Sequence, residues 1–235
     1  MVAAGCYPIP PENSTWVQEL WTLKERLKPS IHETPWLPSM NLLVHRPAFE
    51  AVGGFDATLR TCEDVDFCYR LRDRGGLIVW DDAIGVTHYG EPATLGILFK
   101  KERWHGVSNY HGLLRHGIRR EELPSLIIPV VVFGAYMLPL VAVPVGMFTG
   151  GGLHVAGASL LLIPPALALA AAGRVAWRAG RPGVFLPLTA IFLVYLTARA
   201  AAVIPDRDTF WQLVYAIQDR GEARRPGAGG CTAPV

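Results

Sequence analysis

The stretch from Ser125 to Thr149 reads SLIIPVVVFGAYMLPLVAVPVGMFT and contains no charged residue. Two further apolar segments follow it: Gly150 to Gly173 is also uncharged, and Pro182 to Ile204 has only Arg199 as a charge. About 20 apolar residues, at a rise of about 1.5 Å per residue, are enough for a helix to cross the hydrocarbon core of a bilayer. The sequence therefore predicts three transmembrane helices, at about 125–149, 151–173 and 183–204.

Helices buried in a large soluble protein are the alternative explanation for these segments. The residues before position 121 are too few to wrap three such helices, so membrane spans are the better interpretation. Five prolines lie within the first two segments, and packed transmembrane helices tolerate proline because neighbouring groups satisfy the freed carbonyls. We expect kinks at these residues, which are Pro129, Pro139, Pro144, Pro164 and Pro165.

Arginines around the apolar segments predict how the chain is oriented. They precede the first segment and separate the second from the third, whereas the Gly150–Gly152 link between the first two has no charge. Cytoplasmic loops are enriched in Lys and Arg. We therefore expect a protein of an inner or plasma membrane, with its amino-terminal region and the second arginine-containing loop in the cytoplasm. The arginines concerned are Arg115, Arg119, Arg120, Arg174, Arg178 and Arg181.

The tail beyond the third segment fits this orientation less well. Three spans place residues 205–235 on the far side of the membrane, yet the tail contains four arginines, Arg207, Arg220, Arg224 and Arg225. Residues 206–219 have one apolar helical face and are expected to lie along the membrane interface. The Gly-, Pro- and Ala-rich end, 226–235, is expected to be disordered.

Residues 1–120 are expected to form a soluble domain of mixed α/β structure. Pro47 is well placed to begin a short helical turn that Gly53-Gly54 ends. Between Glu63 and Arg74, apolar residues recur at helical spacing, which predicts an amphipathic helix. Strands are predicted at 39–46, 77–80 and 83–88, and helices at 47–52, 63–74 and 92–110.

Three carboxylates are crowded into the segment TCEDVDFCYR (61–70), where the amphipathic helix begins. Carboxylates are favoured at a helix amino terminus by its exposed N–H groups, which is a purely structural reason for Glu63 or Asp64. Capping does not explain a third carboxylate, Asp66. Repulsion among the three carboxylates raises the pKa of at least one of them unless a cation or a hydrogen-bond donor lies nearby. A helix cap and a base or metal site therefore both remain open at this point.

Three segments together resemble the carboxyl-terminal half of the catalytic domain of family 2 glycosyltransferases. They are NLLVHRPAFEAVGGFD (41–56), CEDVDFCYRLRDRGG (62–76) and VTHYGEPATLGILFKKERWHG (86–106). The match covers roughly residues 30–110, and its order and spacing make it specific. The resemblance implies a partial GT-A fold and an inverting, nucleotide-sugar-dependent, hexosyltransferase-like enzyme, followed here by an α-helical membrane domain.

The family's x-E-D motif falls on Cys62-Glu63-Asp64. The resemblance therefore implies that Asp64, with Glu63 beside it, is the catalytic base that takes a proton from the acceptor hydroxyl. Gly53-Gly54 resembles the family's glycine loop, where the missing β-carbon lets the backbone approach the sugar donor or acceptor. Asp56 follows that loop and is included in the acceptor-side set.

Other residues are assigned by the same resemblance to the donor diphosphate and to the acceptor. His88 matches a histidine that reaches the metal or the diphosphate, and KKERW (100–104) resembles a Q-x-x-R-W motif with Lys100 in place of Gln. Arg103 would hold diphosphate charge and Trp104 would shape the acceptor end. Trp36 is a candidate acceptor contact. The structural alternatives are a satisfied buried imidazole for His88, a juxtamembrane anchor for Arg103 and Trp104, and packing for Trp36.

The resemblance also implies parts that are expected before residue 1. A GT-A enzyme holds its nucleotide in an amino-terminal half of about 100 residues and binds Mg²⁺ or Mn²⁺ through D-x-D at a strand end. The sequences DVD (64–66) and DRD (206–208) lack that context. We therefore expect a fragment that is inactive alone.

Two functions follow as hypotheses. The first is transfer of a sugar from a nucleotide-sugar to a lipid-linked or polysaccharide acceptor of the cell envelope. The second is a non-catalytic membrane scaffold or pseudoenzyme. Nucleic acid is not expected as a ligand, because 22 Lys and Arg nearly balance 20 Asp and Glu.

Overall fold

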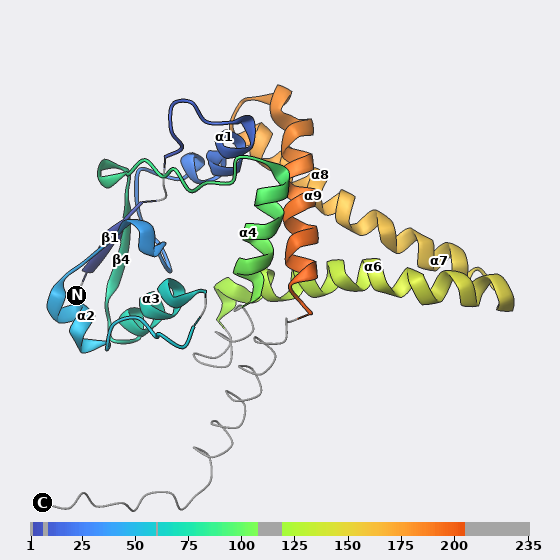
Figure 1. The fold of residues 1–235 in the computed structure, drawn as a ribbon, viewed down its shortest axis with the longest axis horizontal. Helices are drawn as coiled ribbons and strands as arrows, with labels where there is room; N and C mark the ends of the chain where they lie inside the picture. Colours follow the sequence, from blue (N-terminus) through green and yellow to red (C-terminus); the bar gives the residue numbers. More distant parts are fainter. Residues whose placement is uncertain (1, 7–8, 60, 108–118, 205–235) are drawn as a thin grey trace, which may run out of the picture.

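The computed structural model describes residues 2–6, 9–59, 61–107 and 119–204 of the chain. It consists of an amino-terminal α/β part, residues 2–107, followed by long apolar helices (Figure 1). The predicted helix at 206–219 and the predicted disordered end at 226–235 lie outside the described residues. The division at residue 120 into domains stays a prediction.

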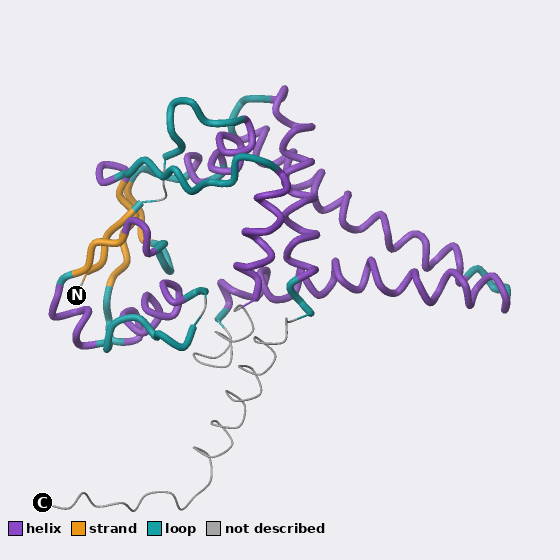
Figure 2. The backbone as a smooth tube through the Cα atoms, viewed as in Figure 1, coloured by secondary structure: helices purple, strands orange, loops and turns teal. Residues whose placement is uncertain are grey.

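The α/β part is built on a small mixed sheet of four strands in the order β2-β4-β1-β3. β1 pairs in parallel with β4 and antiparallel with β3, while β2 pairs antiparallel with β4. Figure 2 shows the strands crossing at the amino-terminal end of the molecule. The strands are β1 (Val2–Gly5), β2 (Ile31–Glu33), β3 (Leu42–Val44) and β4 (Leu77–Asp81).

Three of the four helices of the α/β part begin at a side-chain cap or close to a proline. α1 (Trp16–Leu23) starts with a capping box between Thr15 and Gln18. α2 (Arg46–Ala51) has Pro47 in its first turn. α3 (Glu63–Asp73) confirms the predicted amphipathic helix, and α4 (Leu95–Val107) starts three residues after Pro92.

The core of the α/β part forms where α2 and α3 cover the sheet. Phe67, Cys68 and Leu71 lie on one face of α3 and are fully buried. They pack with residues from the strands and from α2, and the cluster consists of Ala3, Cys6, Leu37, Ala48, Val52, Phe67, Cys68, Leu71, Ile78 and Trp80. This packing fixes the amino terminus of α3 relative to the sheet.

Two strand predictions need correction. The predicted strand at 83–88 is wrong: Asp82–Ile84 form a 3₁₀ turn, and only an isolated bridge between Thr87 and Ile9 remains. The physical reason is that the Asp81 side chain accepts a hydrogen bond from the Ala83 N–H at 2.9 Å and turns the chain. The strand predicted at 39–46 is shorter, because Ser39–Asn41 form a second 3₁₀ turn.

Three apolar helices follow the α/β part and are long enough to cross a membrane. They cover Arg120–Thr149 (30 residues, mean hydropathy 2.5), Leu153–Arg178 (26 residues, 2.0) and Pro182–Ala201 (20 residues, 1.8). The first contains α6 (Leu123–Thr149), the second α7 (Leu153–Ser159) and α8 (Ile163–Arg178), and the third α9 (Phe185–Ala201). The predicted layout of a partial α/β domain with three apolar helices is confirmed.

The apolar helices are arranged unequally. α6 packs along α7 and projects with α7 and α8 away from the α/β part as a hairpin, here called the apolar hairpin (Leu123–Arg178). α9 instead runs across the base of this hairpin and lies beside α4 (Figure 1). Three prolines stay inside α6, and the Pro164-Pro165 pair follows a 3₁₀ turn at Leu160–Leu162.

Candidate active site

Asp64 lies in the first turn of α3, where the chain turns sharply into the helix. Cys62 precedes it with a left-handed φ of 65°, which is uncommon for a residue other than glycine. The Asp64 carboxylate accepts hydrogen bonds from the Ser39 N–H at 3.1 Å and the Val65 N–H at 2.8 Å. Burial raises the pKa of Asp64, and these two N–H groups only partly oppose that shift.

The three crowded carboxylates have different environments. Asp66 is buried and lies 2.7 Å from the Arg70 guanidinium, which also donates to the backbone carbonyls of Val52 and Gly54. Glu63 accepts a weaker hydrogen bond from the Ser39 hydroxyl at 3.4 Å. Asp66 therefore fastens α3 to the loop after α2. Asp64 is held by backbone N–H groups, as suits a base.

The glycine loop has a clear structural role. Gly53 and Gly54 have φ of 80° and 69°, and a β-carbon on Gly54 would lie 2.9 Å from the Phe49 ring. Their N–H groups bond to the carbonyls of Glu50 and Phe49 and so end α2. Asp56 accepts hydrogen bonds from the Thr58 N–H at 2.9 Å and the Thr58 hydroxyl at 2.6 Å. The acceptor-side role of this loop stays a prediction.

A cavity of about 370 Å³ opens beside this region. Ser39 lines it and also holds Asp64, so the cavity lies close to the carboxylate. Its volume is at the small end of ligand pockets. The other lining residues are Leu42, Val44, Arg46, Phe49 and Phe55. Trp36 packs against the core, partly buried.

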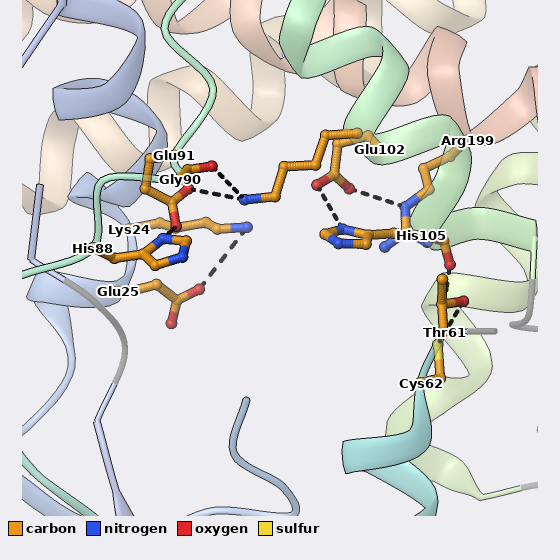
Figure 3. Close-up of polar contacts among 11 residues, drawn as sticks. Lys24, Glu25, Thr61, Cys62, His88, Gly90, Glu91, Glu102, His105 and Arg199 are labelled. Carbon is orange, nitrogen blue, oxygen red and sulfur yellow. Dashed lines mark hydrogen bonds and ion pairs between the residues drawn. The ribbon is translucent and has the colours of Figure 1, made fainter. Parts of the chain in front are cut away.

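His88 lies in the loop before α4 and is oriented by a buried carboxylate. Its Nδ1 is 3.0 Å from Oε1 of Glu91, which is only 8% exposed (Figure 3). The Lys101 ammonium lies 3.7 Å from the same carboxylate and donates to the Gly90 carbonyl at 3.2 Å. A carboxylate bound at Nδ1 leaves Nε2 of the imidazole for an external ligand.

The residues of the predicted Q-x-x-R-W motif point outward. Lys100, Arg103 and Trp104 are exposed, and Trp104 remains 49% accessible. The intervening Glu102 points inward instead and is 3% exposed. The described structure does not bring Lys100, Arg103 or Trp104 into a contact that tests their donor-side assignment, which stays a prediction.

Glu102 forms a polar cluster that links α4 to α9. Its two oxygens lie 3.1 Å from His105 Nδ1 and 3.2 Å from Arg199 Nε (Figure 3). Burial alone raises the pKa of Glu102, but His105 and Arg199 outweigh this and lower it below its usual range. The Cys62 thiol lies 4.0 Å from the His105 carbonyl, so the cluster reaches the turn before Asp64.

The sequence analysis did not identify the partners of His88, which are Glu91 and Lys101. It also did not identify the polar cluster of Glu102, His105 and Arg199. Two signals pointed to the polar cluster. Glu102 and His105 are three residues apart on a helix and so share a face. Arg199 is a charge inside an apolar segment, where a partner is the usual explanation.

The described residues alone do not build a metal site. Among them no group of three or more His, Cys, Asp or Glu side chains is placed to hold an ion. His88 offers one ligand, whereas protein sites for Mg²⁺ usually supply one or two carboxylates, with waters and substrate phosphates completing the octahedron. The metal therefore stays a prediction.

Comparison with known proteins supports one class of enzyme. No family model matches the chain, and no solved structure matches it. An N-acetylglucosaminyl-diphospho-decaprenol L-rhamnosyltransferase of Mycobacterium tuberculosis is 40% identical over 83 residues, which are 34% of this chain and 27% of the relative. A pre-mycofactocin glycosyltransferase of the same organism is 26% identical over 115 residues, 49% of this chain and 23% of the relative.

The match therefore spans about a quarter of the length of these curated relatives. Both relatives are glycosyltransferases by name. A part of the chain, less than half of its length, is therefore similar in sequence to part of a glycosyltransferase, and the chain also contains three helices that are long and apolar enough to cross a membrane.

Proposed function

We propose that this chain contributes the acceptor-side half of the active site of a membrane-bound, inverting glycosyltransferase of family 2, with the GT-A fold. The environment of Asp64 is the observation that carries the proposal. Asp64 has a raised pKa and is held by backbone N–H groups, whereas Asp66 is paired with Arg70. The curated relatives support the same class of reaction.

Asp64 acts as the general base in the proposed reaction. The acceptor hydroxyl gives its proton to the Asp64 carboxylate while its oxygen bonds to the anomeric carbon of the donor sugar. The bond from that carbon to the nucleoside diphosphate breaks on the opposite face, so the configuration inverts. A base is most effective when its pKa lies near the working pH, and burial shifts the pKa of Asp64 in that direction.

The donor side is assigned to the loop before α4 and to α4 itself. His88, oriented by Glu91, presents Nε2 to the diphosphate, and Lys101 adds a cation to the residues that the resemblance implies, Lys100, Arg103 and Trp104. When bound, Mg²⁺ or Mn²⁺ would neutralise diphosphate charge, with His88 as one possible ligand. The main ligands and the nucleotide contacts belong to sequence outside the described residues.

A lipid-linked acceptor suits the chain better than a free polysaccharide. The apolar helices follow the α/β part directly and would hold its site at the membrane surface. One relative is named for a diphospho-decaprenol-linked acceptor. We assign the acceptor contacts to the cavity beside Ser39 and to the Gly53-Gly54 loop, together with Asp56 and Trp36, which the family resemblance implies.

Sugar transfer by membranes containing the complete protein tests this proposal. Asp64→Asn should reduce transfer by about 10²–10⁴-fold, as expected for loss of a general base, while the protein still inserts in the membrane. Glu33→Gln is the matched control, because Glu33 is an exposed carboxylate of β2 that does not line the cavity assigned to the acceptor. Wild-type turnover in the Asp64→Asn variant would remove the base assignment.

The second candidate is a non-catalytic scaffold that retains the acceptor half and its anchor. The polar cluster that joins α4 to α9 favours it, because such a cluster serves stability without substrate. An absence of transfer to any lipid acceptor by the complete wild-type protein, supplied with nucleotide-sugars and Mn²⁺, would support the scaffold.

A further inference from the structure

Both ends of α9 contact the α/β part of the chain. In the link that leads into α9, Arg181 lies 3.4 Å from Glu19 of α1, and Arg178, the last residue of α8, donates to the Leu27 carbonyl at 3.3 Å. At the carboxyl end, Arg199 lies 3.2 Å from Glu102 of α4. Glu19 and Glu102 belong to one folded part of the protein, so the two ends of α9 meet the same domain.

Contacts between these ends continue along the length of α9. Leu188 and Ile191 of α9 share a buried cluster with Leu20 and Leu23 of α1 and with Leu98 of α4, and the rings of Trp21 and Tyr195 lie 5.6 Å apart. Figure 1 shows α4 and α9 side by side. If α9 crossed the bilayer, α4 would have to enter the hydrocarbon with it.

The composition of α4 opposes such an insertion. Within four residues it carries Lys100, Lys101, Glu102 and Arg103, and charged side chains are costly inside a bilayer. At the carboxyl end of α4, a β-carbon on Gly106 would lie 2.6 Å from the Ala202 β-carbon, so the two helices stay in close contact past Arg199. α4 and α9 therefore share one environment.

Exposure of apolar side chains separates α9 from the apolar hairpin. The outer part of the hairpin exposes large residues such as Leu140 (67%), Phe148 (92%) and Leu162 (68%), as expected of surfaces that face lipid. Within the described α9, Leu186 at 72% is the large hydrophobic that is exposed. Protein therefore covers the large apolar side chains of α9 more than those of the apolar hairpin.

We infer that α9 does not cross the bilayer but lies along its surface, between the α/β part and the lipid. The apolar hairpin then provides two spans, and both ends of α9 stay on the side of the α/β part. A spanning helix places its ends on opposite sides of a hydrocarbon core of about 30 Å, which the contacts of Arg181 and Arg199 with one domain do not allow. Trp177, near the end of α8, is 87% exposed, as suits a tryptophan at the membrane interface.

The charge of the tail supports two spans independently. With α9 on the surface, the chain leaves Ile204 on the same side as the arginines that precede the hairpin. The tail then lies on the cytoplasmic side, where Lys and Arg are enriched, like the other arginines that flank the hairpin. The tail arginines are Arg207, Arg220, Arg224 and Arg225. Three spans would place these four positive charges on the opposite side.

Cysteine labelling with a membrane-impermeant maleimide separates the two topologies. Single cysteines are introduced by Glu50→Cys in the α/β part, Thr149→Cys at the hairpin tip and Ile204→Cys after α9, in a chain whose own four cysteines are replaced by serine. Ile204 is 59% exposed and so accessible to the reagent. In vesicles of either orientation, position 204 should label together with position 50 and opposite to position 149. Labelling of 204 together with 149 would overturn the inference.

Reporter fusions repeat the test without removing any cysteine. Alkaline phosphatase and green fluorescent protein are fused in turn to the carboxyl end of the full chain and compared with the same reporters fused after Thr149. We expect fluorescence without phosphatase activity from the reporters at the end of the chain. The reporters fused after Thr149 should give phosphatase activity without fluorescence. Phosphatase activity at both positions would establish three spans and refute the inference.

Discussion

Glu102 on α4 and Arg199 on α9 lie 3.2 Å apart, and this contact joins the α/β part to the apolar helices. Glu102 is 3% exposed and also holds His105. The arginine that interrupts the third apolar segment therefore has a defined partner in the domain that carries Asp64. Because His105 reaches the Cys62 turn, the contact also supports the start of α3.

Removing one partner of this pair should destabilise the protein. Glu102→Ala leaves Arg199 buried without its carboxylate, and breaking a buried ion pair in this way costs about 3–5 kcal/mol. Thermal unfolding of the detergent-solubilised protein measures the change, with Glu50→Ala as the exposed control. A double Glu102→Gln, Arg199→Gln variant should recover part of the loss, and a double variant no better than the single one would contradict the pairing.

The same pair predicts how stability depends on pH. The pKa of Glu102 is lowered in the folded state, so its contribution is fully present above its ordinary value of 4.5 and is lost as the pH falls below that value. Wild-type protein should lose more stability than Glu102→Gln between about pH 5 and pH 3. Parallel losses in the two proteins would show that Glu102 does not titrate against Arg199.

Asp64 should have the opposite effect on stability. Its pKa is raised in the folded state, so the folded protein is stabilised when Asp64 is protonated, and this contribution is lost as the pH rises through that raised pKa. Asp64→Asn, whose amide oxygen can still accept one of the two N–H hydrogen bonds, should therefore keep or raise the melting temperature at pH 7 while it reduces transfer. A clear fall in melting temperature would favour a capping role over a catalytic one.

Asp66 serves as the internal comparison for Asp64. Asp66→Asn should lower the free energy of unfolding by roughly 1–3 kcal/mol, because Arg70 loses its charged partner between α3 and the Gly53-Gly54 loop. Transfer per folded molecule should fall far less than in Asp64→Asn. Equal losses of activity in the two variants would show that the crowded carboxylates act only through the fold.

Arg103 tests the assignment of α4 to the donor. Arg103→Lys should weaken donor binding by the complete protein about tenfold or more, because an ammonium cannot reproduce a bidentate contact of guanidinium with phosphate. Arg74→Lys, at the exposed carboxyl end of α3, is the matched control, because Arg74 is not assigned to the donor. Unchanged donor affinity and turnover in Arg103→Lys would favour a membrane anchor.

Local patterns in the sequence were sufficient to predict α2, α3, β4 and the three apolar helices. Each depends on residues close in the chain, such as Pro47 or the apolar spacing within Glu63–Asp73. β1 and β2 were missed because they are only four and three residues long and are defined by pairing with distant segments. The strand prediction at 83–88 was wrong because the Ala83 N–H donates a hydrogen bond to the Asp81 side chain, which turns the chain there.

The candidate site was predictable only in part. The x-E-D motif located Asp64, but the spacing of α4 residues did not reveal which of them face inward. That choice depends on α9, which is far away in sequence and packs against Leu98, Glu102 and Gly106. The number of transmembrane spans likewise cannot be predicted from composition. A helix that is covered by protein and a helix that is covered by lipid can have equally apolar sequences.

If α9 lies along the bilayer surface, as inferred above, its packing against α1 and α4 sets the height of Asp64 above the lipid. A domain tethered by a flexible linker could rise or tilt to meet acceptors of different length, whereas one that rests along an entire helix keeps a fixed distance from the bilayer. In the proposed reaction, the acceptor must then bring its hydroxyl to that level. The number of phosphate and sugar units between lipid and hydroxyl would select the substrate, and the length of the lipid chain would matter little.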